Sequence, residues 1–559
     1  MRLAAVILSG LATLAAAQEP TDDGPSSFGA DVEAFEKWLA QYRQGAFRIM
    51  RGGVEDRAAI TQVDMILGSM ARWNTLASAK RLFAVACVQP SLGTKQVSTD
   101  RVSLERELQP WKVRSLARKH IAAMEVRGLD RWLALQLQLS ARGAEAKKTA
   151  LPRAAAMRIL ALRDSVPGIL ALLKATQSLP PQERVRAVNS LSVIATQETI
   201  PHFIGLLRDS EPNVRIAALN ALGKSLAPLT DETELETITT EHAKLRDQVI
   251  SRMKPLLLRD RVWQVRAAAA ENLAKLRSKH VIPVLIAGLK AETSKKKDPW
   301  ALDMRIHRLL EGLTGQKILP GNARLWEAFW RKEGASFRYT GDAKLAKESA
   351  SATRYQKFFS IDIESDRVVF VLDFSGSMAE PVTLKSKTTS ASPGTTTTKA
   401  KLVVEELKKI VMGLPDGTMF NLVVFSEEVS VWREQRDGQL ALVKLDDTSR
   451  DDLLGSYFDS LQPAGATNLY GALDRILNFA GRGLYDKYYG LAFDTVYVLS
   501  DGAPSWGKVI DKDEIIHRVT EANRLRKLNI HTVTFGDKNA TEFLARLAKA
   551  NGGRHIHVE

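Results

Sequence analysis

Cysteine is almost absent from this chain, which holds a single one, Cys87, in 559 residues. No intramolecular disulfide can form, so the small disulfide-stapled scaffolds of many exported proteins are excluded. Long hydrophobic runs are also lacking, because no segment after Leu3–Leu14 is apolar for the length of a membrane helix. Cys87 lies in an apolar stretch with no neighbouring histidine, and the sequence therefore predicts a buried structural thiol rather than a catalytic one.

The amino terminus has the pattern of a secretory signal peptide. Met1-Arg2 gives a basic start, Leu3–Leu14 is apolar, and small residues follow at Ala15–Ala17. We predict removal of residues 1–17 by cleavage between Ala17 and Gln18, and then a flexible lead-in over residues 18–27. The mature protein is expected to be secreted or periplasmic, with no transmembrane segment.

Basic residues are unevenly distributed. The formal net charge is +15, but residues 366–559 contain 24 Lys and Arg against 26 Asp and Glu, a net charge of −2. The preceding part of the chain therefore carries +17. Charge asymmetry of this kind bears on partners and on solubility. An anionic polymer or an envelope surface is the partner that a basic region would favour, and plain solubility is the alternative.

Helical periodicity dominates residues 28–149. Two helix faces are predicted from apolar spacing: Phe35, Trp38, Leu39 and Tyr42 for the first, and Trp132, Leu135 and Leu139 for the second. The second is ambiguous, because leucines at 133, 135, 137 and 139 also alternate as they would in a strand.

Residues 150–335 repeat a unit of two helices. The copies share a Val-Arg-Ala-like helix followed by one with proline in its first turn: residues 153–160 with 166–173, 185–191 with 199–207, 214–219, and 265–270 with 281–286. Proline is tolerated there because its missing N–H would be unpaired in any case. The array resembles a HEAT-repeat solenoid, with an insertion around Leu229–Asp247. Such solenoids present an extended binding surface or serve as spacers.

A second kind of organisation begins after a linker and lead-in strand at residues 336–365. The apolar run 368–372 predicts a strand buried on both faces of a parallel sheet, and Asp373, Ser375 and Ser377 follow it directly. Thr467 lies in a later loop, and Asp501 follows another buried strand at 496–499. Ligands gather at the carboxyl ends of such strands, and oxygen-only side chains suit a hard divalent cation.

These three segments, in this order, resemble the von Willebrand factor A domain with its metal-ion-dependent adhesion site. The family pattern is D-x-S-x-S, then Thr, then Asp, and the five positions are filled here by Asp373, Ser375, Ser377, Thr467 and Asp501. The resemblance implies an α/β doubly wound, Rossmann-like domain over residues 366–559. With the signal peptide and the HEAT-like repeats, it implies a secreted multidomain protein of bacterial type, an all-α solenoid followed by this domain.

The resemblance also implies a mechanism. The two serines would bind the metal directly, the two aspartates directly or through water, and Thr467 when a partner is engaged. Mg²⁺ is the expected cation, with Mn²⁺ or Ca²⁺ as alternatives, and an Asp or Glu carboxylate of a protein partner would complete its coordination shell. Gly376 and Gly502 are expected to permit the tight turns. The predicted function is non-enzymatic adhesion. A metal-dependent hydrolase and a scaffold that the metal only stabilises remain the alternatives.

Three further features of the sequence bear on function. The Ser/Thr-rich segment Thr383–Thr398 departs from the family pattern and predicts an insertion beside the metal face. The segment 502–508 fits the G-x-x-x-x-G-K part of a phosphate loop, but Val509 stands where Ser or Thr would bind Mg²⁺, so no nucleotide is expected. His555 and His557 share one strand face without a third zinc ligand, so the sequence favours ordinary strand residues.

Overall fold

The structure is a computed structural model that describes most of the chain. The described residues are 26–44, 50–88, 101–230, 239–294, 302–318, 322–339, 356–383, 396–434, 442–479, 493–535 and 538–558, without 52, 53, 56, 142, 144, 195 and 364. The predicted signal peptide, most of the lead-in, the lysines at 295–297 and the centre of the segment Thr383–Thr398 lie outside them.

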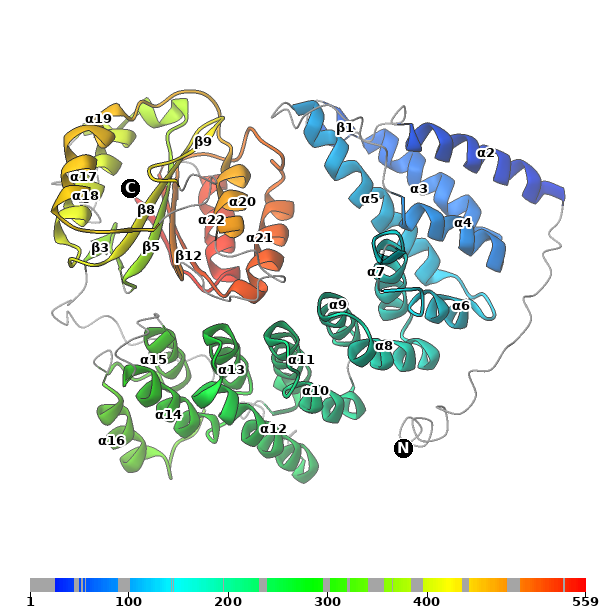
Figure 1. Cartoon of the computed structure of the whole chain (residues 1–559), viewed down its shortest axis with the longest axis horizontal. Helices are drawn as coiled ribbons and strands as arrows, with labels where there is room; N and C mark the ends of the chain where they lie inside the picture. The colour runs from blue at the N-terminus through cyan, green and yellow to red at the C-terminus, as the bar shows by residue number, and fades with distance from the viewer. Residues whose placement is uncertain are drawn as a thin grey trace. The chain divides into compact units, whose positions relative to one another are not determined.

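The chain divides into two compact units, residues 1–225 and 226–559. Helices make up the first unit and the start of the second, as the blue-to-green part of Figure 1 shows. The elements of this helical part are α2 (Ser26–Arg43), β1 (Met50–Arg51), β2 (Val54–Glu55), α3 (Arg57–Arg72), α4 (Leu76–Ala86), α5 (Arg101–Ala123), α6 (Leu129–Gln136), α7 (Glu145–Arg163), α8 (Val166–Ser178), α9 (Pro181–Leu191), η2 (Gln197–Thr199), α10 (Ile200–Leu206), α11 (Pro212–Thr230), α12 (Thr240–Arg259), α13 (Trp263–Lys275), α14 (Val281–Thr293), α15 (Leu302–Thr314) and α16 (Ala323–Glu333). No described helix is long and apolar enough to cross a membrane.

Helices two positions apart in the sequence pack together as well as consecutive ones. In the first unit α7 packs on both α8 and α9, and in the second unit α12 contacts α14, α13 contacts α15 and α14 contacts α16. The alanines 267–270 of α13 are fully buried, so this helix is enclosed by its neighbours. Stacked layers of paired helices are the arrangement that the sequence repeats predict.

One predicted helix face is right and the other is wrong. Phe35, Trp38, Leu39 and Tyr42 are all buried, as expected. In α6, however, Leu129 and Leu133 are buried whereas Leu135 is 48% exposed. The helix ends at Gln136, before Leu139, so that residue does not belong to a helix face at all. Cys87 also differs from expectation, because it is partly exposed at the end of α4.

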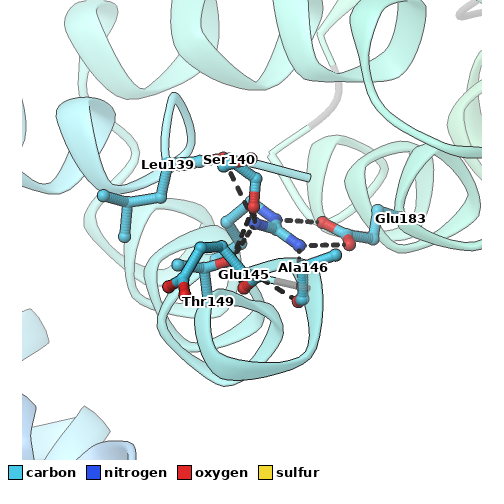
Figure 2. A network of polar contacts seen from close by, with 7 residues as sticks. Leu139, Ser140, Glu145, Ala146, Thr149 and Glu183 are labelled. Carbon is cyan, nitrogen blue, oxygen red and sulfur yellow. Dashed lines mark hydrogen bonds and ion pairs between the residues drawn. The ribbon is translucent and has the colours of Figure 1, made fainter. Parts of the chain in front are cut away.

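Buried arginines connect the helices of the repeats. Arg153 on α7 is fully buried and forms a two-pronged ion pair with Glu183 on α9, with Nη2 2.7 Å from Oε1. Its Nη1 donates to Thr149 Oγ1 at 2.7 Å and to the carbonyl oxygens of Leu139 and Ser140, and Figure 2 shows these partners around it. Every side of the guanidinium is therefore satisfied, as a buried cation requires.

The same device recurs in the second unit, where Arg266 pairs with Glu292 at 2.8 Å and both side chains are 3% exposed. Arg266 also donates to the carbonyl oxygens of residues 260 and 261, six and five positions back. Arg215 makes the same two bonds, to residues 209 and 210. Arg215 and Arg266 are the arginines of two Val-Arg copies in the sequence, so equivalent repeat positions have equivalent contacts.

Removing one partner of the buried pair should be strongly destabilising. We expect Glu183→Gln to lower the free energy of unfolding by about 3–5 kcal/mol, because Arg153 keeps its charge without a counter-charge. The matched control is Glu145→Gln on the same unit, which loses an exposed pair with Lys148 and should cost under about 1 kcal/mol. Urea denaturation followed by circular dichroism measures both. Equal denaturation midpoints for the two variants would contradict the larger cost expected for breaking the buried pair.

The remainder of the second unit is an α/β domain with helices on both faces of its sheet (Figure 1). Its elements are β3 (Lys357–Phe358), β4 (Ile361–Asp362), β5 (Arg367–Asp373), η4 (Gly376–Ala379), β6 (Pro381–Thr383), β7 (Thr396–Thr398), α17 (Lys399–Gly413), β8 (Met419–Phe425), β9 (Val429–Val431), β10 (Val443–Lys444), α18 (Asp447–Asp452), η5 (Leu453–Tyr457), α19 (Phe458–Ser460), α20 (Leu469–Phe479), β11 (Thr495–Ser500), α21 (Lys512–Arg526), β12 (Asn529–Phe535), α22 (Lys538–Ala550) and β13 (His555–Val558).

The central sheet has the order β10-β8-β5-β11-β12-β13, with β9 also paired to β8. β8, β5, β11, β12 and β13 run parallel, whereas β9 and β10 are antiparallel. Since β8 follows β5 but β11 lies on its other side, the strand order reverses between β5 and β11. The predicted fold class, helical repeats followed by a doubly wound α/β domain, is confirmed, and its central sheet is mixed.

Two details of the sheet differ from the sequence prediction. The lead-in strand predicted within residues 336–365 is not a single strand, because Phe359 and Ser360 have φ angles of 45° and 72° and turn the chain between β3 and β4. This small hairpin is separate from the central sheet. The edge strand β10 was not predicted, since two residues are too few to show a period.

An ion-pair cluster joins the last repeat helices to the α/β domain within the second unit. Glu271 of α13 lies 2.7 Å from the Nζ of Lys527, the residue that ends α21, and 3.0 Å from Nη1 of Arg305. Arg305 also donates to the carbonyl oxygen of Lys527 at 2.6 Å. Burial acts to raise the pKa of Glu271, but the two cations outweigh it and lower the pKa to about 2. The carboxylate is therefore charged at neutral pH.

Candidate metal centre at the carboxyl ends of β5 and β11

The candidate site lies where the strand order reverses. β5 and β11 pair in parallel with Leu372 opposite Leu499, so Asp373 and Asp501 leave neighbouring strands at the same edge of the sheet. All residues of both strands after Arg367 are buried. The crevice at such a reversal is where open α/β sheets place their ligands.

Asp373 is fully buried and both of its oxygens accept hydrogen bonds. The backbone N–H of Ser375 donates to Oδ1 at 2.8 Å, and the hydroxyl of Ser500 donates to Oδ2 at 2.5 Å. Burial raises the pKa of Asp373 to about 6, against the lowering effect of these donors, and the nearby charge of Asp501 adds to the rise. The site therefore holds a carboxylate whose negative charge is poorly compensated.

Ser375 and Ser377 lie beside it on the turn into η4. Their hydroxyl oxygens are 3.2 Å apart, and Ser377 Oγ donates to Asp501 Oδ1 at 2.9 Å. These oxygen–oxygen distances match the edge of an octahedron around Mg²⁺, roughly 3 Å for metal–oxygen bonds of about 2.1 Å. The donors thus fit a small hard cation in type and in spacing.

Thr467 comes to the site on a third loop. Gly376 N donates to the carbonyl oxygen of Gly465 at 2.9 Å, which ties the serine turn to this loop. Thr467 is 5% exposed, and a Cβ atom built on Gly502 would lie 3.9 Å from its Oγ1. The structure therefore brings together all five residues that the sequence singled out.

The glycines that the turns require differ from those expected. Neither Gly376 nor Gly502 has a positive φ, whereas Gly465 has +73° and Gly507 has +98°. A Cβ atom on Gly507 would also lie 1.9 Å from Asn468 Oδ1. There is no room for a side chain at Gly507 because residues 505–507 pack closely against the Thr467 loop. Ser505 and Trp506 both donate their N–H to Thr467 O. Those two amides, in the phosphate-loop-like segment, face protein rather than a phosphate.

Lys399, which the sequence analysis missed, is part of the same cluster. Its Nζ lies 2.7 Å from Asp501 Oδ2 and 2.8 Å from Glu380 Oε2, and it donates to Ser377 O at 3.4 Å. Burial acts to lower the pKa of Lys399, but the bonds to Asp501 and Glu380 raise it overall. A lysine in the first position of a helix opposes the helix dipole, and this was the one sequence signal available.

Other candidate ligands do not gather elsewhere in the described residues, where no group of three or more His, Cys, Asp and Glu side chains is placed to hold a metal. His557 Nδ1 lies 3.0 Å from Thr534 Oγ1, and His555 Nδ1 lies 2.8 Å from Thr532 Oγ1. Both histidines therefore contact threonines of β12. The metal centre proposed here relies on hydroxyls, with two carboxylates.

Comparison with known families agrees with this architecture. The family model of the von Willebrand factor type A domain matches residues 366–556, the model of HEAT repeats matches 169–240, and that of the PBS lyase HEAT-like repeat matches 265–291. The chain therefore carries a von Willebrand factor type A domain preceded by HEAT repeats. A domain of this type indicates a role in protein–protein interaction.

Individual relatives match about a third of this chain. Inter-alpha-trypsin inhibitor heavy chain H1 of Sus scrofa is 33% identical over 34% of this chain and 18% of its own length. Human von Willebrand factor A domain-containing protein 3A is 26% identical over 36% of this chain and 14% of its own length. The chain thus spans less than a fifth of these relatives. A solved structure, von Willebrand factor type A from Catenulispora acidiphila, is 20% identical with a TM-score of 0.25, covering 34% of this chain and 38% of that one.

Replacing Asp373 should show separately how much its burial destabilises the fold and whether it binds the proposed metal. Because the folded-state pKa is raised from 3.8 to about 6, the metal-free protein should lose stability as pH rises between these values, and should not regain it above them. Asp373→Asn keeps an acceptor for Ser375 N and a partner for Ser500. We expect it to be more stable than wild type in EDTA at pH 7 by about 1–3 kcal/mol, with a flatter pH profile.

The same variant should gain no stability from Mg²⁺, whereas wild type should gain some. Chemical denaturation in EDTA and in Mg²⁺, from pH 4 to 8, measures both effects. A variant less stable than wild type in EDTA would contradict the burial argument.

Proposed function

We propose that this protein is a non-enzymatic, exported binding protein whose von Willebrand factor type A domain uses a divalent cation to engage a carboxylate on a protein partner. One observation carries the proposal: five oxygen-bearing side chains from three separate loops meet at the reversal of strand order. Mg²⁺ is the proposed cation, because these ligands are all oxygens and their spacing suits its small octahedron.

The charge of the site supports an acidic partner. Asp373 and Asp501 supply two negative charges, and the hydroxyls of Ser375, Ser377 and Thr467 are neutral. A bound divalent cation would therefore leave no net negative charge at the site, and Lys399 adds a positive one. When bound, the cation would act as a Lewis acid toward an incoming carboxylate oxygen. An Asp or Glu side chain of a partner is the ligand that this electrostatic field favours.

The helical repeats are proposed as a scaffold or a second binding surface. Their excess of basic residues, +17 before residue 366, favours an anionic polymer or the envelope surface. The amino-terminal pattern supports export with cleavage between Ala17 and Gln18, to the periplasm or beyond.

The experiment that tests the proposal combines metal binding with capture. Isothermal titration with Mn²⁺ and Mg²⁺ should show one site in wild type and at least about a hundredfold loss in Asp501→Asn, which removes one of two charged ligands. Wild type in Mg²⁺ should retain partners from an envelope extract that are released by EDTA and are not retained by Asp501→Asn. Asp459→Asn, an exposed aspartate of the same domain, is the matched control.

Each outcome separates the candidate functions. Capture that ignores both EDTA and Asp501→Asn would place binding on the helical repeats and contradict the metal-dependent mechanism. If Asp501→Asn changed thermal stability alone, the cation would be structural. Turnover of an ester or phosphoester substrate that Asp501→Asn abolished would favour a metal-dependent hydrolase.

A further inference from the structure

Lys399 places a fixed positive charge inside the candidate metal centre. Its side chain is 11% exposed, and that of Asp501, which it contacts at 2.7 Å, is 1% exposed. Asp501 therefore has one oxygen bound to Ser377 and the other bound to an ammonium group. An ion pair buried to this degree is screened little by solvent.

The lysine is anchored by the strands that leave the site. β6 and β7 pair antiparallel, with Pro381 opposite Thr398, and Glu380 and Lys399 flank this pair directly. Lys399 N donates to Glu380 O at 3.1 Å, and the two side chains meet at 2.8 Å. Glu380 is 64% exposed, so it compensates the ammonium charge only in part. The backbone of Lys399 is fixed as the first residue of α17, whose N-cap is Thr398.

We propose that Lys399 is a specificity-determining residue: an internal cation that weakens the hold of the site on its divalent metal and strengthens the hold of the loaded site on an anionic partner. This inference rests on the proposed function. With Asp373, Asp501 and Mg²⁺ the charges cancel, and Lys399 adds a positive charge beside the metal that the exposed Glu380 offsets only in part. The same charge repels the incoming metal and attracts the carboxylate of the partner.

A merely structural role predicts the opposite sign. If Lys399 only held Asp501 in position, its removal would misplace that ligand and metal binding would weaken. The electrostatic role predicts that losing the positive charge tightens metal binding. It also predicts that losing the charge of Glu380, which offsets the ammonium, loosens metal binding. Two variants with opposite expected effects thus distinguish the two roles.

The test uses the full mature chain, with Mn²⁺ and Mg²⁺ affinities from isothermal titration. Lys399→Met should bind the metal at least about tenfold more tightly than wild type, because one unit charge a few ångström away is removed. Glu380→Gln should bind it about threefold more weakly, the smaller effect of an exposed charge. Lys401→Met, an exposed lysine on the same helix, is the matched control and should stay within about twofold.

The second measurement concerns the partner side. With saturating Mn²⁺, retention on immobilised poly-glutamate is the probe, and Lys399→Met should be retained at least about fivefold less than wild type. Circular dichroism confirms that each variant folds, and Glu380→Gln, changed at an exposed position, keeps the inference testable if Lys399→Met is unfolded.

Metal affinity of folded Lys399→Met that is equal to or weaker than wild type would overturn the inference, as would tighter binding in Glu380→Gln. Failure of the proposed function looks different, because wild type itself would then bind no metal, and the inference would fall with it. Wild type that binds metal and loses it in Asp501→Asn, with Lys399→Met unchanged, would overturn this inference alone.

Discussion

The parallel pairing of β5 with β11 is the constraint on which the site depends. Its register sets Leu372 against Leu499, and from that single alignment Asp373 reaches Ser500 while Asp501 reaches Ser377. A slip of one residue would turn every side chain of a strand to the opposite face of the sheet. Because both strands are buried on both faces, a slip would force every side chain into packing shaped for another, so the core of the domain and the geometry of the site have one cause.

The buried carboxylates of Asp373 and Asp501 are stabilised by different partners. Asp373 accepts bonds from neutral donors, and its pKa rises to about 6 because those donors compensate its charge only in part. Asp501 is instead paired with an ammonium group. One carboxylate is thus available to a cation, whereas the other already has one nearby. The two candidate ligands of the proposed metal centre therefore differ in their charged neighbours.

The strands of the α/β domain could be predicted from sequence because parallel strands, buried on both faces, are continuous apolar runs. The predicted strands 368–372 and 496–499 lie within β5 and β11 and are one residue short at each end. The five predicted ligands could also be grouped from the sequence, because four of them follow the ends of predicted strands and Thr467 lies in a loop that the family pattern identifies. No sequence pattern placed Lys399 at the site, because its partners Glu380 and Asp501 are 19 and 102 residues away.

In the helical part, apolar periodicity was not sufficient to predict every buried face and helix end. For α6, two apolar spacings were compatible with the same residues, and tertiary packing selected Leu129 and Leu133 over Leu135. The hydrogen bonds at a helix end determine where the helix stops, and apolar periodicity carries no information about them. The predicted helix therefore includes Leu139, although α6 ends at Gln136. The pairing of Arg153 with Glu183 spans 30 residues and follows from the stacking of α7 on α9 rather than from either segment alone.

The cluster of Glu271, Arg305 and Lys527 has a mechanical consequence. Lys527 lies just before β12 begins, at the end of the sheet opposite the candidate metal centre. Force applied between the carboxyl end of β11 and this cluster would pass from β11 into β12 through their pairing. The two strands are joined in parallel from Thr495 and Asn529 to Ser500 and Thr534. Tension along this line loads all of their hydrogen bonds together in shear, the direction in which a sheet resists rupture best.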